Sequence, residues 1–241
     1  MSKPSTAAVL NLPVHLSADY IGLLVELIQS GRGGHVITLN AEMAMLARRE
    51  ARLAGLIRTA ELVVPDGAGV VWALQREGQR VRRCAGIDLV EGVMPALARL
   101  GTRVYLLGAA PEVIAGAANH WQERLPDLQI CGYRDGFFGQ SDEESLLAQL
   151  EHLAPGLILV GLGVPKQEYW IERARTRLPR CVFVGVGGSF DIWAGTKERA
   201  PSWLRENYLE WLYRLYKEPW RARRMLALPK FALAILTGAR V

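Results

Sequence analysis

The chain has 241 residues, of which 50% are hydrophobic and 22% charged, and it carries a formal net charge of +5. This length supports one sizeable core, and the composition excludes a disordered chain. Its three cysteines include no CxxC pair, which argues against a disulfide framework or a zinc site and favours a reduced, cytoplasmic compartment.

Short apolar runs rich in β-branched residues alternate with helical patterns along the first 195 residues. Strands are predicted at 9–12, 36–39, 62–64, 103–107, 128–131, 157–160 and 181–186. Helices are predicted at 18–29, 41–57, 70–76, 86–100, 111–124 and 141–153, and another ends at 177. This alternation predicts an α/β fold with a largely parallel sheet and flanking helices. Ligands in such folds bind outside the carboxyl ends of the strands.

Thr38 and Asn40 lie on one strand face at such a carboxyl end. Asn40 suits the N-cap of the helix that follows. Both residues also suit contact with a ligand, and the local pattern does not decide between these interpretations.

Asp66 follows another short buried strand, in the sequence Pro65-Asp66-Gly67-Ala68-Gly69. It is either the cap of the next helix or a catalytic carboxylate whose pKa a low-dielectric pocket can tune. The local pattern alone favours the cap.

The stretch from 156 to 201 contains two more strand ends that carry polar or glycine-rich segments. One strand leads through a glycine turn into Pro165-Lys166-Gln167-Glu168, and the next ends in Gly187-Gly188. About twenty residues separate the two strands, as expected for parallel strands joined by a crossover helix. We therefore expect a binding site at these ends.

A change in composition after Gly195 divides the chain into a body, residues 1–195, and a C-terminal appendage, residues 196–241. The appendage has ten Lys/Arg and four Glu, and the body has nineteen basic and twenty acidic residues, so the surplus of positive charge belongs to the appendage. One apolar helix face is predicted from Leu204, Tyr208, Trp211, Leu212 and Leu215, and Pro219 should break or restart the helix. The segment is a packed helix with a solvated basic face, a membrane-surface element or a nucleic-acid surface. Apolar residues beside basic ones favour the bilayer surface over nucleic acid.

Several catalytic motifs are absent from the sequence. There is no HExxH, Walker A or GxSxG motif, and no DxD pair of the kind that holds a metal in many nucleotide-sugar transferases. A transferase of this sequence is therefore expected to work without a metal or other cofactor, and to neutralise a leaving diphosphate with arginines.

Taken together, these segments resemble the WecG/TagA/CpsF family of bacterial glycosyltransferases along nearly the whole chain and in the right order. The matching pieces are Thr38-Leu39-Asn40, Pro65-Asp66-Gly67-Ala68-Gly69, Gly86-Ile87-Asp88, Leu106-Leu107-Gly108, Gly136-Phe137-Phe138, Gly163-Val164-Pro165-Lys166-Gln167-Glu168, Gly185-Val186-Gly187-Gly188-Ser189-Phe190-Asp191, Ala194-Gly195, Arg199-Ala200-Pro201, Leu209-Glu210-Trp211-Leu212-Tyr213-Arg214-Leu215, Glu218-Pro219 and 221–224. Tyr208 departs from the pattern, where a smaller residue is expected.

The resemblance implies a Rossmann-like body and an appendage that meets the membrane and helps to close the site. It also implies inverting transfer of a sugar from a UDP donor to a polyprenyl-diphosphate-linked N-acetylglucosamine-type acceptor, in cell-surface polysaccharide synthesis. The sugar is of the N-acetylmannosamine, N-acetylmannosaminuronate or glucose type. The protein would then act in the cytoplasm, peripherally at the inner face of the plasma membrane, without a nucleic-acid partner.

The resemblance also assigns roles to particular residues. Asp66 becomes the candidate base, and Thr38 and Asn40 hold sugar or acceptor hydroxyls. Gln167 lies beside them, and Lys166 or the amides of Gly187 and Gly188 meet the nucleotide. Three arginines are expected to bind diphosphate, with a solvated or lipid-facing basic stripe as the alternative: Arg214, Arg221 and Arg224.

The competing hypothesis is a non-catalytic membrane-surface or nucleic-acid-binding module on a nucleotide-binding body. The polar clusters at the strand ends argue against it. The sequence leaves the oligomeric state open, a homo-oligomer included.

Overall fold

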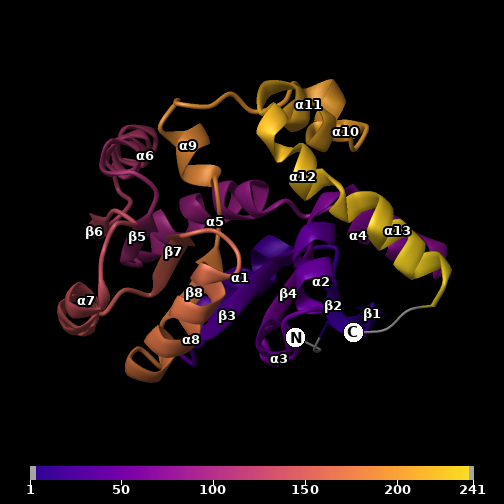
Figure 1. Ribbon diagram of the computed structural model, residues 1–241. Coiled ribbons are helices and arrows are strands. Elements are labelled where there is room, and N and C mark those ends of the chain that lie inside the picture. Colours follow the sequence, from indigo (N-terminus) through magenta and orange to yellow (C-terminus); the bar gives the residue numbers. More distant parts are fainter. Residues whose placement is uncertain (1–3, 239–241) are drawn as a thin grey trace. The chain divides into compact units, whose positions relative to one another are not determined.

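A computed structural model describes residues 4–238 (Figure 1). The chain forms two compact units: residues 1–18, 38–85 and 199–241 make the first, and residues 19–37 and 86–198 make the second. The predicted division between a body and an appendage from residue 196 stays a prediction. In the structure the C-terminal residues are grouped with 38–85, the part of the chain that contains Asp66.

Six strands form one sheet in the order β4-β3-β8-β7-β5-β6, and the pairs from β3 to β6 are parallel. The strands are β3 (Gly34–Leu39), β4 (Leu62–Pro65), β5 (Val104–Gly108), β6 (Ile130–Arg134), β7 (Leu157–Gly161) and β8 (Val182–Gly185). Helices flank the sheet, so the predicted α/β, Rossmann-like fold is confirmed.

The second unit supplies most of this sheet and its covering helices. These are α1 (Tyr20–Gln29), α5 (Gly86–Leu100), α6 (Pro111–Arg124), α7 (Gln140–Leu153), α8 (Lys166–Arg177) and α9 (Ser189–Trp193). One apolar cluster joins α7 and α8 to the strands and includes Leu147, Leu150, Ile158, Val160, Trp170, Ile171 and Phe183. On α9, Trp193 packs edge-to-face on Trp121 of α6, 5.4 Å between ring centroids, and its indole N–H donates to Glu91 of α5 at 3.1 Å.

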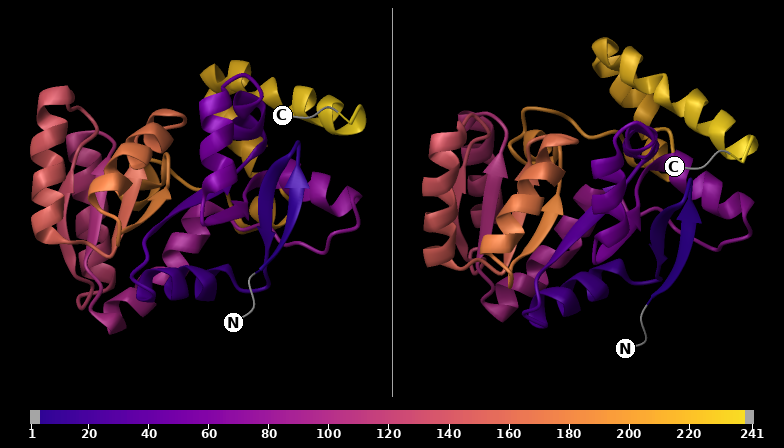
Figure 2. Two further views of the ribbon diagram at one scale, coloured as in Figure 1. Left: turned by 90° about the horizontal axis from the view of Figure 1, so that it is seen from below. Right: turned by 60° about the horizontal axis from the view of Figure 1, so that its bottom comes forward.

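The first unit begins with an antiparallel hairpin, β1 (Ser5–Val9) and β2 (Leu12–Leu16), seen as two adjacent indigo arrows in Figure 2. The strand predicted at 9–12 was therefore wrong: those residues contain the turn. Leu10 and Asn11 both have positive φ, 52° and 61°, as a two-residue hairpin turn with the right twist requires. Leucine is uncommon in that conformation, and for this reason the sequence does not predict the turn.

A histidine of the hairpin accepts a backbone hydrogen bond from β4, the end strand of the sheet. The Val63 N–H of β4 donates to His15 Nδ1 of β2 at 2.9 Å. Burial lowers the pKa of His15, against a smaller opposing effect of this hydrogen bond. The imidazole is thus a neutral acceptor that meets a backbone donor, a structural role.

The helix predicted over 41–57 is two helices, α2 (Ala41–Ala47) and α3 (Ala51–Thr59). The chain leaves the helical conformation at Glu50, whose φ and ψ are −122° and 93°. No glycine or proline marks this break, so the periodic pattern continued through it.

The C-terminal residues form a series of short helices rather than one long one. They are α10 (Ser202–Glu206), α11 (Glu210–Lys217), the 3₁₀ turn η1 (Pro219–Arg221), α12 (Ala222–Met225) and α13 (Ala227–Leu236). Tyr208 has a φ of 59°, which ends α10 and separates Leu204 and Tyr208 from the apolar residues of α11. The single apolar helix face predicted from 204 to 215 is therefore wrong, whereas a break at Pro219 is confirmed.

The last helix, α13, packs on α2 and α4 (Gly67–Arg76) of the same unit, as the yellow helix of Figure 1 shows. Its Phe231 is 2% exposed. A Cβ at Gly69 would lie 3.5 Å from the Phe231 ring and 3.1 Å from the Ala41 Cβ, so the small residue on α4 makes room for this contact. Among residues 4–238, none of the helices combines the length and apolarity needed to cross a bilayer.

Removing the Phe231 ring tests whether α13 is docked in solution. We expect Phe231→Ala to lower the free energy of unfolding by about 3 kcal/mol or more, as large buried aromatic truncations do. Urea denaturation followed by tryptophan fluorescence measures this. Leu233→Ala, which alters an exposed residue of the same helix, is the matched control. Equal midpoints for the two variants would mean that α13 is not docked through Phe231.

Candidate functional site

In the first unit, Thr38, Asn40 and Asp66 come together at the carboxyl ends of β3 and β4. The Asp66 N–H donates to the Leu39 carbonyl oxygen at 2.9 Å, which brings the two chain segments side by side. Asn40 caps α2: its Oδ1 accepts the Met43 N–H at 3.0 Å. The cap interpretation of Asn40 is confirmed.

Asp66 stands at the N-cap position of α4, but its side chain accepts no capping hydrogen bond from that helix. Gly67, with a φ of 79°, takes the chain sharply from the strand into the helix. The Asp66 carboxylate lies instead 3.6 Å from Arg83 Nε and is about a quarter exposed. The local sequence pattern favoured the cap, and the structure contradicts that interpretation.

Arg83 reaches Asp66 because the segment after α4 returns along β4. The Cys84 N–H donates to the Pro65 carbonyl oxygen at 2.8 Å, which places the residue before it beside the strand end. The other end of the guanidinium, Nη2, donates to Glu210 Oε2 of α11. Sequence reasoning missed Arg83, since it lies in an irregular segment seventeen positions beyond Asp66 with no motif around it.

Glu210 is the buried acidic centre of this cluster, with 4% of its surface exposed. It accepts from Arg83 and also from Arg214 Nη2, at 2.5 Å. Burial acts to raise the pKa of Glu210, but Arg214, Arg83 and Arg199 together outweigh it and hold that pKa below its ordinary value. Glu210 is therefore a stable anion at neutral pH. It is part of a sequence motif, but its own chemistry was not predicted.

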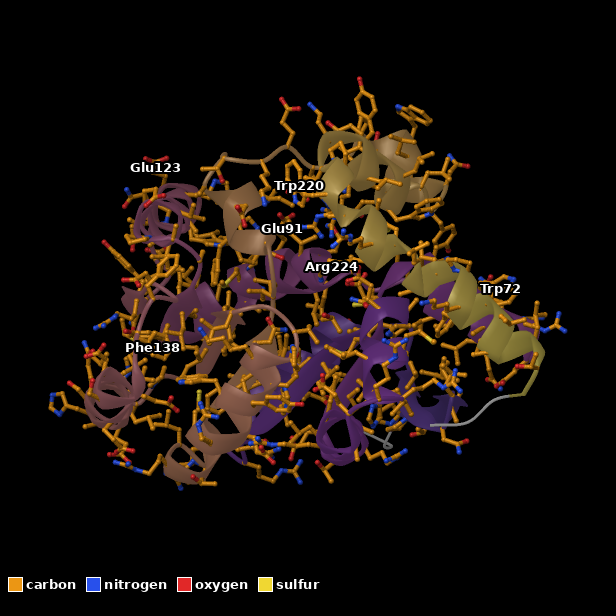
Figure 3. The ribbon with its side chains drawn as sticks, viewed as in Figure 1. Trp72, Glu91, Glu123, Phe138, Trp220 and Arg224 are labelled. Atoms are coloured by element: carbon orange, nitrogen blue, oxygen red, sulfur yellow. The ribbon has the colours of Figure 1, made fainter. Side chains whose placement is uncertain are left out.

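Each of the three C-terminal arginines predicted to bind diphosphate is paired with a carboxylate. Arg214 meets Glu210, Arg221 Nε meets Glu218, and Arg224 Nη2 meets Glu42 of α2 at 2.9 Å. Figure 3 labels Arg224, whose side chain extends from α12 toward α2. The three arginines lie on α11, η1 and α12, so they do not form one stripe on a single helix.

In the second unit, Lys166 and Gln167 begin α8, directly after the end of β7. Lys166 Nζ lies 5.8 Å from the centroid of the Phe138 ring. Gln167 is buried, and its Nε2 donates to Glu168 Oε1 at 2.8 Å. A Cβ at Gly185 of β8 would lie 2.4 Å from that Nε2, so only glycine leaves space for the amide.

Gly187 and Gly188 follow β8 in the same unit. The Val186 N–H donates to the Val160 carbonyl oxygen at 2.9 Å, which continues the pairing of the two strands up to this turn. Gly187 has a φ of 51°, and Gly188 precedes α9. The turn exposes backbone at the carboxyl ends of two strands, as predicted.

Among the described residues, no three His, Cys, Asp or Glu side chains lie close enough together to hold a metal ion. Four guanidinium groups of the first unit take part in the contacts above: Arg83, Arg214, Arg221 and Arg224.

The model of the glycosyl transferase WecG/TagA/CpsF family matches residues 7–240 of the chain. Two curated relatives are both named N-acetylglucosaminyldiphosphoundecaprenol N-acetyl-beta-D-mannosaminyltransferase. The relative from Bacillus spizizenii (strain ATCC 23059 / NRRL B-14472 / W23) is 34% identical over 227 residues, which cover 94% of this chain and 85% of its own. The relative from Bacillus subtilis (strain 168) is 35% identical over 205 residues, or 85% of this chain and 79% of its own.

The buried Glu168 gives a pH-dependent test of the second unit. Burial, opposed by the Gln167 hydrogen bond, raises the pKa of Glu168 from 4.5 to about 7. The folded state therefore favours the protonated carboxyl, and stability is lost as the pH rises from 4.5 through 7. Glu168→Gln keeps an acceptor for Gln167 and carries no charge. As the pH rises through this range, we expect the free energy of unfolding of Glu168→Gln to increase relative to that of the wild type by up to about 3 kcal/mol, since one pKa unit is about 1.4 kcal/mol.

Urea denaturation at several pH values between 4.5 and 8 measures this difference. Glu123→Gln, at an exposed position of α6 (labelled in Figure 3), is the control and should follow the wild type. A constant difference between Glu168→Gln and wild type across the range would show that Glu168 does not titrate there.

Proposed function

The chain belongs to the WecG/TagA/CpsF family of glycosyltransferases, and we propose that it transfers a sugar from a UDP donor to a polyprenyl-diphosphate-linked N-acetylglucosamine acceptor, with inversion at the anomeric carbon. The names of the two relatives support an N-acetylmannosamine donor over the uronate and glucose alternatives, and support the acceptor. The observation that carries the proposal is Asp66, a partly exposed carboxylate at a strand end, beside an arginine and not used as a helix cap.

Inverting transfer needs a base on the acceptor side. The acceptor hydroxyl attacks the anomeric carbon opposite the leaving UDP and loses its proton in that step. In our proposal Asp66 takes this proton. Thr38 and the amide nitrogen of Asn40 hold sugar hydroxyls next to it, since Asn40 Oδ1 is already bound to Met43 N–H.

The leaving group and the acceptor both carry a diphosphate, whose charge arginines stabilise by charge-assisted hydrogen bonds. We propose this role for Arg214, Arg221 and Arg224, without a metal. Lys166 and the Gly187-Gly188 turn are proposed to meet the nucleotide. Gln167 is proposed to bind substrate from the start of α8, where its side chain is buried and donates to Glu168.

We also propose that the C-terminal residues bind a membrane surface at the cytoplasmic face, where the lipid-linked acceptor lies. Their exposed aromatic side chains support this: Trp203, Tyr216 and Trp220 are 61%, 79% and 72% exposed. They lie in the segment that holds the surplus of basic residues, as Figure 3 shows for Trp220. Aromatic and basic side chains together suit the interface of an anionic bilayer.

Asp66→Asn tests the base. The variant keeps the size and polarity of the side chain but cannot accept a proton, so we expect kcat to fall by about 10² to 10⁴ while UDP still binds. The assay is UDP release from a panel of UDP-sugars, with and without a short-chain polyprenyl-diphosphate N-acetylglucosamine acceptor, in EDTA. Asp127→Asn, at an exposed position, is the control.

Full activity of Asp66→Asn would remove the base assignment. If the wild type releases UDP from none of the donors, a UDP titration separates the remaining possibilities. Bound UDP would indicate a different acceptor. Absence of UDP binding would favour the competing hypothesis of a non-catalytic membrane-surface or nucleic-acid-binding module.

Trp220→Ala tests the membrane surface. Burial of an aromatic side chain contributes roughly 1.5 to 3 kcal/mol, so its loss should weaken binding to vesicles of phosphatidylethanolamine and phosphatidylglycerol about tenfold or more. Co-sedimentation measures this. Binding should also weaken with salt, because the basic residues are attracted to anionic lipid. Tyr133→Ala, an exposed aromatic residue of the second unit, is the control and should bind as wild type. An equal loss of vesicle binding in both variants would contradict the proposal that the C-terminal residues form the membrane-binding surface.

A further inference from the structure

Arg83 lies between two carboxylates from different parts of the first unit. Its Nε is 3.6 Å from Asp66 Oδ1, at the end of β4, and its Nη2 donates to Glu210 Oε2, on α11. The Arg83 side chain is 14% exposed and that of Glu210 is 6% exposed. The contact with Glu210 is a close hydrogen bond, whereas the distance from Arg83 Nε to Asp66 Oδ1 is longer, at 3.6 Å.

This asymmetry matters for a base. A guanidinium that binds a carboxylate closely stabilises its ionised form and makes it a weaker proton acceptor. A second carboxylate that takes the closer contact offsets the cation and leaves the first more basic. The effect is strong here because both members of the closer pair are shielded from water.

We propose that Glu210 is a positioning residue for the transfer: it holds the Arg83 guanidinium off the Asp66 carboxylate and so leaves that carboxylate available to the acceptor hydroxyl. The inference rests on the proposed role of Asp66 as base and adds the residue that keeps it effective. Glu210 itself does not touch the reacting atoms.

The charges around the pair support this arrangement. Arg83 faces Asp66 from the segment after α4, and Glu210 is faced by Arg83, by Arg214 of its own helix and by Arg199 from the segment before α10. Three cations thus share two carboxylates. Without the charge of Glu210, Arg83 would be drawn closer to Asp66.

The same contact gives the C-terminal segment a chemical role. Glu210 is on α11, so its carboxylate is in place only while that helix is docked. The strength of the base at the end of β4 is thereby tied to the presence of the C-terminal helices, in addition to the arginines that these helices supply.

Glu210→Gln in the full chain tests the proposal. The variant keeps a hydrogen-bond acceptor for Arg83 but removes the charge. We expect kcat to fall about tenfold and the acidic limb of the kcat/KM profile to move about one pH unit lower. Glu210→Asp restores the charge and should return the limb toward its wild-type position.

A second readout needs no turnover. The Asp66 carboxyl carbon, assigned by comparison with Asp66→Asn, is titrated by ¹³C NMR, and its pKa should fall by about one unit in Glu210→Gln. The control is Glu218→Gln, a buried glutamate of the same segment that pairs with Arg221 instead, and it should leave the Asp66 pKa unchanged.

The outcomes separate the two proposals. An unchanged Asp66 pKa and an unshifted limb in Glu210→Gln, with only lower thermal stability, would overturn the inference and leave a structural ion pair. A lowered Asp66 pKa in a protein whose wild type transfers no sugar would support the electrostatic contact and reject the proposed function.

Discussion

A buried glutamate on α11 sets the arrangement of the first unit. Glu210 has almost no contact with water, and an isolated carboxylate in that environment is costly unless cations and hydrogen bonds compensate it. Arg83 and Arg214 provide this compensation from two separate segments. The C-terminal helices are thus fixed by a polar contact at one end and by the buried Phe231 of α13 at the other. Removing either guanidinium would leave the buried Glu210 carboxylate less fully compensated, which would destabilise the docked position of α11.

The turn that carries Asp66 depends on backbone freedom next to it. Gly67 takes a positive φ directly after the aspartate, and the α4 helix starts without a capping hydrogen bond from the side chain. A capping aspartate would have its oxygens bound to backbone N–H groups, which stabilise the anion and lower its basicity. The α4 helix therefore lacks the stabilisation that a side-chain cap at Asp66 would give it. Stability given up at a helix start is consistent with a functional site rather than a structural one.

The hydrophobic periodicity of the sequence predicted the helices and strands well wherever glycine or proline residues also marked the turns between them. The six parallel strands and most helices of the second unit lie within a few residues of their predicted positions. The failures occur where the backbone changes direction without glycine or proline: at Leu10 in the hairpin, at Glu50 between α2 and α3, and at Tyr208 after α10. The candidate site was predictable where it follows strand ends, as with Asp66 and Asn40. Arg83 and Glu42 were not, because their roles come from contacts over long sequence separations that leave no local pattern.

The pairing of the C-terminal arginines with glutamates bears on how a diphosphate would bind. A guanidinium has five N–H donors in a planar fork, and each of the three contacts described uses one nitrogen of the group. A phosphate oxygen can therefore add to a fixed arginine without displacing its glutamate. The paired carboxylates also offset the positive charge of these arginines. If these arginines bind a diphosphate as proposed, guanidiniums already held by carboxylates would lose less conformational entropy on binding than free ones.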